Sequence, residues 1–173
     1  MTELTTVRLR LRPFTSGDVQ AVHAYASDPE VTRYMDWGPN TPAESEAFVA
    51  EAAAPADGVQ PFAIEHEGHL IGAVELRVTG RTHARGEFGY TLARSAWGRG
   101  FATEAATAVL AYAFDRVGLH RVAATCDPAN TASRRVLEKA GLTYEGHLKD
   151  YLRIRGEWRD RLLYAALSTR PAC

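Results

Sequence analysis

Cysteine is scarce in this chain of 173 residues, which contains only Cys126 and Cys173. Two cysteines do not make a disulfide scaffold, so an apolar core must hold the fold together. No apolar run is long enough to span a membrane, and Met1–Leu4 lacks the basic start and apolar block of a signal peptide. We therefore expect a cytoplasmic protein that has no membrane partner.

The chain also lacks an excess of either charge. Lys and Arg total 20, Asp and Glu total 21, and the net charge is −1. A general nucleic-acid binder would carry a strong basic excess, so we expect no direct contact with nucleic acid. A chain of 173 residues is long enough for one domain with its own core. We expect a single domain over residues 1–173.

Hydrophobic periodicity and turn signals divide the chain into alternating strands and helices. The predicted strands cover residues 7–12, 62–66, 70–78, 87–92, 121–126, 144–152 and 158–167. The predicted helices cover 15–26, 41–54, 101–117 and 130–140. Thr15 and Asp18 have the spacing of a capping box. Gly89, inside a predicted strand, indicates a bulge or the close approach of another backbone.

Two glycines flank an arginine between a predicted strand and a predicted helix, at Gly98, Arg99 and Gly100. Backbone N–H groups at a helix start bind phosphate oxygens, and glycine lets a ligand approach the backbone closely. The third glycine of a dinucleotide-binding fingerprint and the Gly-Lys-Ser/Thr of a P-loop are both absent. Taken alone, this loop is either an anion site or an ordinary turn that packs tightly.

Asn130 and Ser133 lie three residues apart at the start of a predicted helix, so they project from one face of its first turn. They either address one ligand together or serve only as an N-cap and a backbone partner. Cys126 lies in an apolar strand with no base beside it, which favours a buried structural cysteine. The segment 66–69 is one residue short of a His-Glu-x-x-His zinc motif, so we expect no metal.

The loop and the Asn130 helix together resemble the GNAT superfamily of acetyl-CoA-dependent N-acetyltransferases. The family's G-x-G-x-A signature matches Gly98–Ala102, and its Asn-x-x-Ser signature with the following helix matches Asn130–Gly141. Three further segments look like the branch that acetylates ribosomal proteins, the RimJ/RimL type: Leu9–Phe14, Glu87–Tyr90 and Tyr144–Lys149.

The resemblance extends from Val7 to Leu167, with one departure from the pattern. Many relatives carry Gln or Arg three residues before the first loop glycine, where this chain has Ser95. The resemblance implies a mixed α/β (α+β) fold with helices on both faces of a central, mostly antiparallel sheet. That sheet is splayed where acetyl-CoA enters, between the strands that end at Leu92 and Cys126.

The resemblance also implies transfer of an acetyl group from acetyl-CoA to a primary amine in a direct ternary complex, and it is compatible with a homodimer. The branch favours a protein N-terminal α-amine, whose pKa of roughly 8 makes it easier to deprotonate than lysine. A polyamine, an amino acid or an aminoglycoside is the alternative acceptor. A non-catalytic acyl-CoA sensor is the alternative of another class.

Site residues follow from the same resemblance. Glu87 is the expected general base, acting through water, although a strand carboxylate can equally be a solvated or ion-paired group. Ser133 is the expected proton donor to the departing thiolate. Trp37 and Tyr90 either line the acceptor pocket or belong to the core, where aromatic residues more often lie. The expected acetyl-CoA contacts are the backbone of Leu92, Ala93 and Arg94 with pantetheine, Gly98, Arg99, Gly100, Phe101, Ala102 and Thr103 with pyrophosphate, and Asn130, Ser133 and Arg135.

Overall fold

The computed structural model describes residues 2–169; Met1 and residues 170–173, which include Cys173, lie outside it. The described residues form an eight-stranded sheet with the strand order β1-β2-β3-β4-β5-β6-β8-β7. Every neighbouring pair is antiparallel except β5 and β6. The strands are β1 (Leu4–Thr5), β2 (Arg10–Arg12), β3 (Val59–His66), β4 (His69–Gly80), β5 (Arg85–Leu92), β6 (Arg121–Cys126), β7 (Thr143–Ile154) and β8 (Glu157–Leu167).

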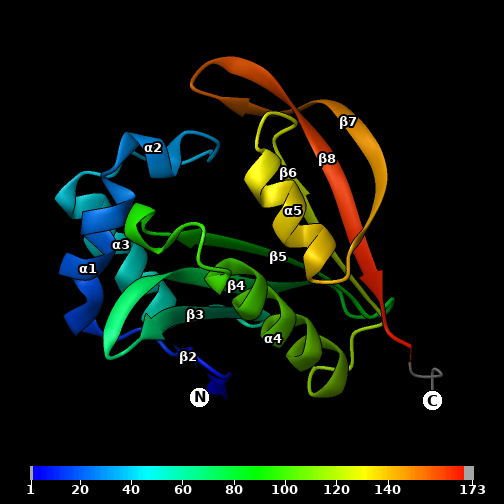
Figure 1. The fold of residues 1–173 in the computed structure, drawn as a ribbon, viewed down its shortest axis with the longest axis horizontal. Coiled ribbons are helices and arrows are strands. Elements are labelled where there is room, and N and C mark those ends of the chain that lie inside the picture. The colour runs from blue at the N-terminus through cyan, green and yellow to red at the C-terminus, as the bar shows by residue number, and fades with distance from the viewer. Residues whose placement is uncertain (1, 170–173) are drawn as a thin grey trace.

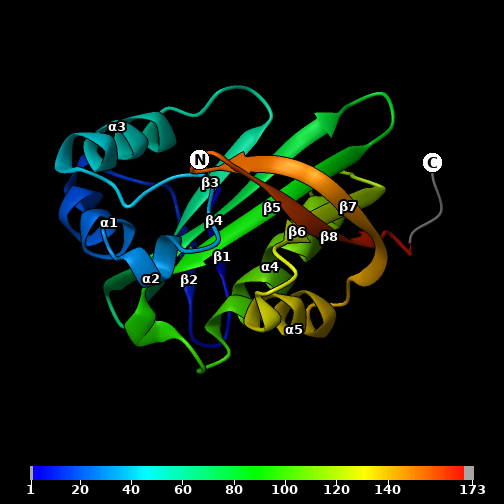
Figure 2. The same ribbon diagram turned by 90° about the horizontal axis from the view of Figure 1, so that it is seen from above.

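Helices cover both faces of this sheet, as predicted (Figures 1 and 2). On one face α1 (Val19–Ala26) and α3 (Pro42–Ala53) pack together, with the short α2 (Pro29–Thr32) beside them. On the other face lie α4 (Phe101–Asp115) and α5 (Thr131–Lys139). Each face has its own cluster of buried apolar side chains, so the sheet is the shared wall of two cores.

Local signals in the sequence explain where α1 and α3 begin. The predicted capping box of Thr15 and Asp18 is confirmed, since the Asp18 carboxylate accepts hydrogen bonds from the Thr15 N–H at 2.7 Å and hydroxyl at 3.1 Å. A second box forms at Thr41 and Glu44, with Pro42 at the first helical position. The Thr41 box therefore satisfies free N–H groups at the start of α3. The Thr15 box opens a 3-10 turn over Ser16–Asp18 that leads into α1, and Asp18, the N-cap of α1, makes no side-chain capping bond there.

The divergence of β5 from β6 positions the functional site. The two strands pair only over Arg85–Glu87 and Arg121–Ala123. Beyond Glu87 the described part of the chain has no further pairing between them, although β5 continues to Leu92. The connection between them is α4, as a parallel pair requires. The expected splay is thus present between the strands that end at Leu92 and Cys126.

Three expectations about local structure were wrong. The strand predicted from Val7 begins only at Arg10, because Thr6 N–H bonds to the Leu9 carbonyl in a turn that leaves Val7 97% exposed. Strand β3 begins at Val59 rather than Phe62; its proline is tolerated because β2 pairs only with residues 63–65 and leaves that edge free. Gly89 makes no bulge, since it pairs regularly with Glu75, and no other backbone crowds the face where its Cβ would lie, because nothing is within 4 Å of that position.

A buried ion pair connects β2 to the start of α1, and it predicts a pH-dependent stability. Arg12 donates to Asp18 at 2.8 and 2.9 Å, and Asp18 is 6% exposed. Burial alone would raise the pKa of Asp18, but hydrogen bonds from Arg12 and Thr15 outweigh it and lower that pKa. A lowered pKa stabilises the fold above about pH 4, and the contribution is lost as pH falls through the folded-state pKa.

We therefore expect Asp18→Asn to lower the free energy of unfolding at pH 7 by about 1–3 kcal/mol. The difference from the unsubstituted protein should shrink below about pH 4, as measured by urea unfolding at several pH values. Asp57→Asn is the matched control, because its ion pair with Arg81 is exposed and should contribute little. An equal loss at every pH would contradict the assignment.

Candidate active site

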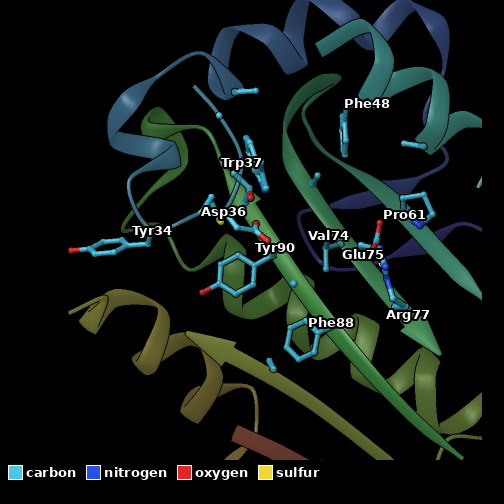
Figure 3. A pocket seen from close by; sticks show the side chains of 18 of the residues that line it. Tyr34, Asp36, Trp37, Phe48, Pro61, Val74, Glu75, Arg77, Phe88 and Tyr90 are labelled. Carbon is cyan, nitrogen blue, oxygen red and sulfur yellow. Dashed lines mark hydrogen bonds and ion pairs between the residues drawn. The ribbon is translucent and has the colours of Figure 1, made fainter. Parts of the chain in front are cut away.

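A cavity of about 990 Å³ opens where β5 and β6 separate. Its walls come from α1, α3 and the loop after α2 on one side, and from β4, β5, the end of β6 and the start of α5 on the other (Figure 3). Trp37 and Tyr90 both line it; that this cavity is the acceptor pocket stays a prediction. Gly89 lines it as well, so the missing side chain leaves room in the cavity rather than bending the strand.

The glycine loop lies at the start of α4, immediately after the strand that borders the cavity. Gly98 and Gly100 have φ values of +72° and +82°, a region that side chains disfavour. The Glu104 N–H bonds to the Gly100 carbonyl, so the N–H groups of residues 101–103 have no carbonyl within the helix. These donors and the helix dipole fit a pyrophosphate.

Side chains around the loop hold it in place. Phe101, predicted among the contacts, is 1% exposed and belongs to the core; only its backbone is available to a ligand. Arg8 and Arg99 each lie 4.6 Å from the centre of its ring. Arg8 also donates to the Arg99 carbonyl at 3.0 Å and binds Glu104 at 2.6 Å. The sequence motif did not reveal this support from the N-terminal segment.

Ser133 and Tyr90 meet across the cavity. The Tyr90 hydroxyl donates to Ser133 Oγ at 3.1 Å, and Asn130 Oδ1 accepts from the Ser133 N–H at 3.0 Å. Burial raises the pKa of Tyr90 to about 12, so it remains a donor at neutral pH. Because Tyr90 donates to the serine oxygen, the Ser133 hydroxyl hydrogen can point to a ligand. Asn130 is both the N-cap of α5 and a lining residue.

The strand end expected to contact acetyl-CoA, residues 92–94, makes hydrogen bonds and an ion pair to other parts of the chain. The Leu92 carbonyl accepts from Trp97 Nε1 at 2.9 Å, and the Ala93 N–H and carbonyl bond to Ile71 and Ala96. The Arg94 side chain binds Asp28 at 3.3 Å. Pairing of this segment with pantetheine therefore stays a prediction. So do contacts from the exposed Arg135 and from Ala102 and Thr103.

Glu87 is exposed and is not among the residues that line the cavity. Glu75 does line it, on the strand next to Glu87, and is bound to Arg77 at 2.8 Å (Figure 3). The sequence reasoning missed Glu75, Asp36 and Arg161, all of them lining residues. A charged residue inside the apolar strand 70–78 was the signal available for Glu75.

Cys126 is buried and unpaired at the end of β6, and burial raises the pKa of its thiol to about 11. It is a poor nucleophile in this state, in agreement with the structural role expected for it. Among residues 2–169, no group of three or more His, Cys, Asp or Glu side chains is placed to hold a metal ion. No described helix is long and apolar enough to cross a membrane.

Known proteins resemble this chain in sequence and in structure. Residues 8–143 match the family model described as acetyltransferase (GNAT) domain. The uncharacterized N-acetyltransferase YnaD of Bacillus subtilis is 36% identical over 95% of this chain and 96% of its own length. The [ribosomal protein uS5]-alanine N-acetyltransferase of Escherichia coli is 37% identical over 57% of this chain and 52% of its own.

Two solved structures share the fold. An acetyltransferase of the GNAT family from Bacillus anthracis superposes with a TM-score of 0.89, at 34% identity over 96% of this chain and 98% of its own. The RimJ of Mycobacterium smegmatis, in complex with CoA-disulfide, superposes with a TM-score of 0.84. It is 31% identical, over 96% of this chain and 88% of its own. The splayed sheet, its glycine loop and these relatives define an N-acetyltransferase. The chain belongs to the GNAT family of acetyltransferases.

The geometry of the glycine loop predicts that a side chain at Gly100 weakens acetyl-CoA binding. Gly100→Val would place a branched residue at a φ of +82° and crowd the N–H groups that face a phosphate. We expect acetyl-CoA affinity, measured by calorimetry, to fall at least about 10-fold, the equivalent of roughly 1.4 kcal/mol.

Gly118→Val is the matched control, because Gly118 has a φ of +77° beyond the other end of α4. It imposes similar backbone strain away from the loop and should leave affinity unchanged. Normal binding by Gly100→Val would exclude the loop as the pyrophosphate site.

Proposed function

We propose that this enzyme transfers an acetyl group from acetyl-CoA to a primary amine within a ternary complex. The observation that carries the proposal is the Ser133–Tyr90 contact inside the cavity. The loop suits the pyrophosphate, and it follows β5, the strand that carries Tyr90. We take residues 1–173 as one catalytic domain, since the family match ends at residue 143 but β7 and β8 continue the same sheet.

The chemistry assigns one task to each side of the cavity. The neutral amine attacks the acetyl carbonyl, a C–N bond forms and the C–S bond breaks. Ser133 gives its proton to the departing sulfur, and Tyr90 stabilises the serine oxygen as the proton leaves. The proton lost by the amine goes to water oriented by a carboxylate, and water returns a proton to Ser133, so the serine hydroxyl is restored. The products are the N-acetylated amine and the CoA thiol.

A protein N-terminal α-amine is the acceptor that we favour. Relatives that carry ribosomal names support it, and a roughly neutral α-amine pKa demands little of a base. A small amine is the second candidate, because a cavity of about 990 Å³ lined by Asp36, Glu44, Glu51, Glu75 and Asp127 suits a compact cation. The free thiol of Cys126 fits a reducing compartment, which supports the cytoplasm as the place of the reaction.

Release of CoA thiol from acetyl-CoA tests the proposal directly. We expect steady release with at least one class among peptides, amino acids, polyamines and aminoglycosides. Ser133→Ala should lower kcat by about 10²-fold or more, as removal of a general acid does, and leave acetyl-CoA affinity within a few-fold. Tyr90→Phe should lower kcat less, because Ser133 remains. Binding of acetyl-CoA without turnover for any acceptor would favour the acyl-CoA sensor instead.

Because Glu87 does not line the cavity, the identity of the general base needs a test of its own. If Glu87 orients the water, Glu87→Gln should lower kcat/KM most below neutral pH, where the acceptor amine is mainly protonated. Glu75→Gln is the matched comparison, one strand away and inside the cavity. An unchanged pH–rate profile for Glu87→Gln, together with a changed one for Glu75→Gln, would transfer the role to Glu75.

A further inference from the structure

One charged side chain of the cavity has no counter-ion. Arg161 on β8 is 6% exposed and lines the cavity. One of its Nη atoms donates to the Tyr34 carbonyl at 3.0 Å, and its Nε is buried without a hydrogen-bond partner. Within residues 2–169, no carboxylate lies within 4.0 Å of this guanidinium. A guanidinium stays charged at neutral pH, and a buried charge is costly unless it is paired.

The strand register turns Arg161 toward the acceptor side of the sheet. Its neighbour Leu162 pairs with Cys126, and both belong to the core that packs beneath α4. Successive strand residues point to opposite faces. Arg161 therefore faces the side covered by α1, α3 and the loop that carries Tyr34, the side opposite the glycine loop's helix.

The other charges of the cavity are of opposite sign or are already paired. Arg77, a second cation of the lining, is bound to Glu75 and is half-exposed. The remaining charged residues in the lining are the carboxylates of Asp36, Glu44, Glu51 and Asp127. The cavity thus offers negative charge to an amine and one buried, unneutralised cation to a second group.

The geometry points to Arg161 as the anchor for a carboxylate on the acceptor. The acceptor is then a primary amine with a carboxylate nearby: a free amino acid, or a peptide whose first residues include an acidic side chain. This inference rests on the proposed acetyl transfer. The planar guanidinium offers two parallel N–H donors to a carboxylate, whereas a neutral acceptor leaves the cation unpaired in the cavity.

Pairs of acceptors that differ in a carboxylate test whether that group contributes to recognition. Glutamate and glycine are compared with their fully amidated forms, and Ala-Glu-Ala-amide is compared with Ala-Gln-Ala-amide. We expect kcat/KM for the better anionic member to exceed that of its neutral partner by about 10- to 100-fold, as for a hydrogen bond to a charged group. The amino acid pairs and the tripeptide pair distinguish the two sources of the carboxylate.

The side chain is tested by Arg161→Met, which removes the charge with little change in volume, and by Arg161→Lys, which keeps it. Arg161→Met should abolish the preference for anionic acceptors, and Arg161→Lys should retain part of it. Arg155→Met is the matched control. Arg155 binds the carbonyls of Thr32 at 3.1 Å and Gly38 at 2.8 Å, so it holds the same loop, but it does not line the cavity. It should affect anionic and neutral acceptors equally.

The same acceptor pairs are also titrated by calorimetry against the CoA-bound protein, which reports the preference without turnover. Equal kcat/KM and equal affinity within every pair would overturn the inference and leave the proposed function intact. An anionic preference that survives in Arg161→Met would overturn it as well. Absence of turnover with an anionic preference in binding would support the Arg161 anchor and refute acetyl transfer.

Discussion

The early separation of two parallel strands is the constraint on which the site depends. β5 and β6 share three residue pairs and then part, so the edge of β5 from Phe88 onward lacks a strand partner in the described chain. An unpaired edge inside a protein leaves polar backbone groups that need partners. The features of the site follow from these two strands: the glycine loop comes after β5, Cys126 ends β6, and Ser133 lies on the helix after it.

The two halves of the sheet are held apart by what packs on them. α4 contacts β4, β5 and β6, and it joins the halves below the opening. On the opposite face, α1 and α3 cover only the first half. The second half is covered there by no described helix; instead its hairpin reaches back through Arg155 and Arg161 to the loop after α2 (Figure 1). The two halves of the sheet thereby form different walls of one cavity.

Most of the fold could be predicted from sequence because its signals are local. The capping boxes at Thr15 and Thr41 and the alternation of buried residues along β6 each depend on residues close in the chain. The two motifs that indicate acetyl-CoA binding are local for the same reason. The contact between Arg161 and Tyr34 could not be predicted, because it joins residues 127 positions apart and no local pattern encodes it.

Errors in the sequence reasoning have the same origin. Val7 alternates correctly for a strand, but Thr6 and Arg8 bind Glu104 on α4 and turn the chain there. Gly89 was interpreted from strand propensity, whereas its surroundings are an open cavity. The role of Glu87 stays a prediction, because it depends on burial, which decides whether a carboxylate meets a substrate and which the sequence does not show.

The contacts of Arg155 affect the order in which parts of the structure can form during synthesis. This side chain, at the tip of the β7–β8 hairpin, binds the carbonyls of Thr32, Met35, Trp37 and Gly38 near the beginning of the chain. During synthesis the donor loop and α4 emerge well before that hairpin. A nascent chain can therefore form the glycine loop and α4 early, whereas the loop after α2 gains its contacts with Arg155 and Arg161 only once β8 has been made.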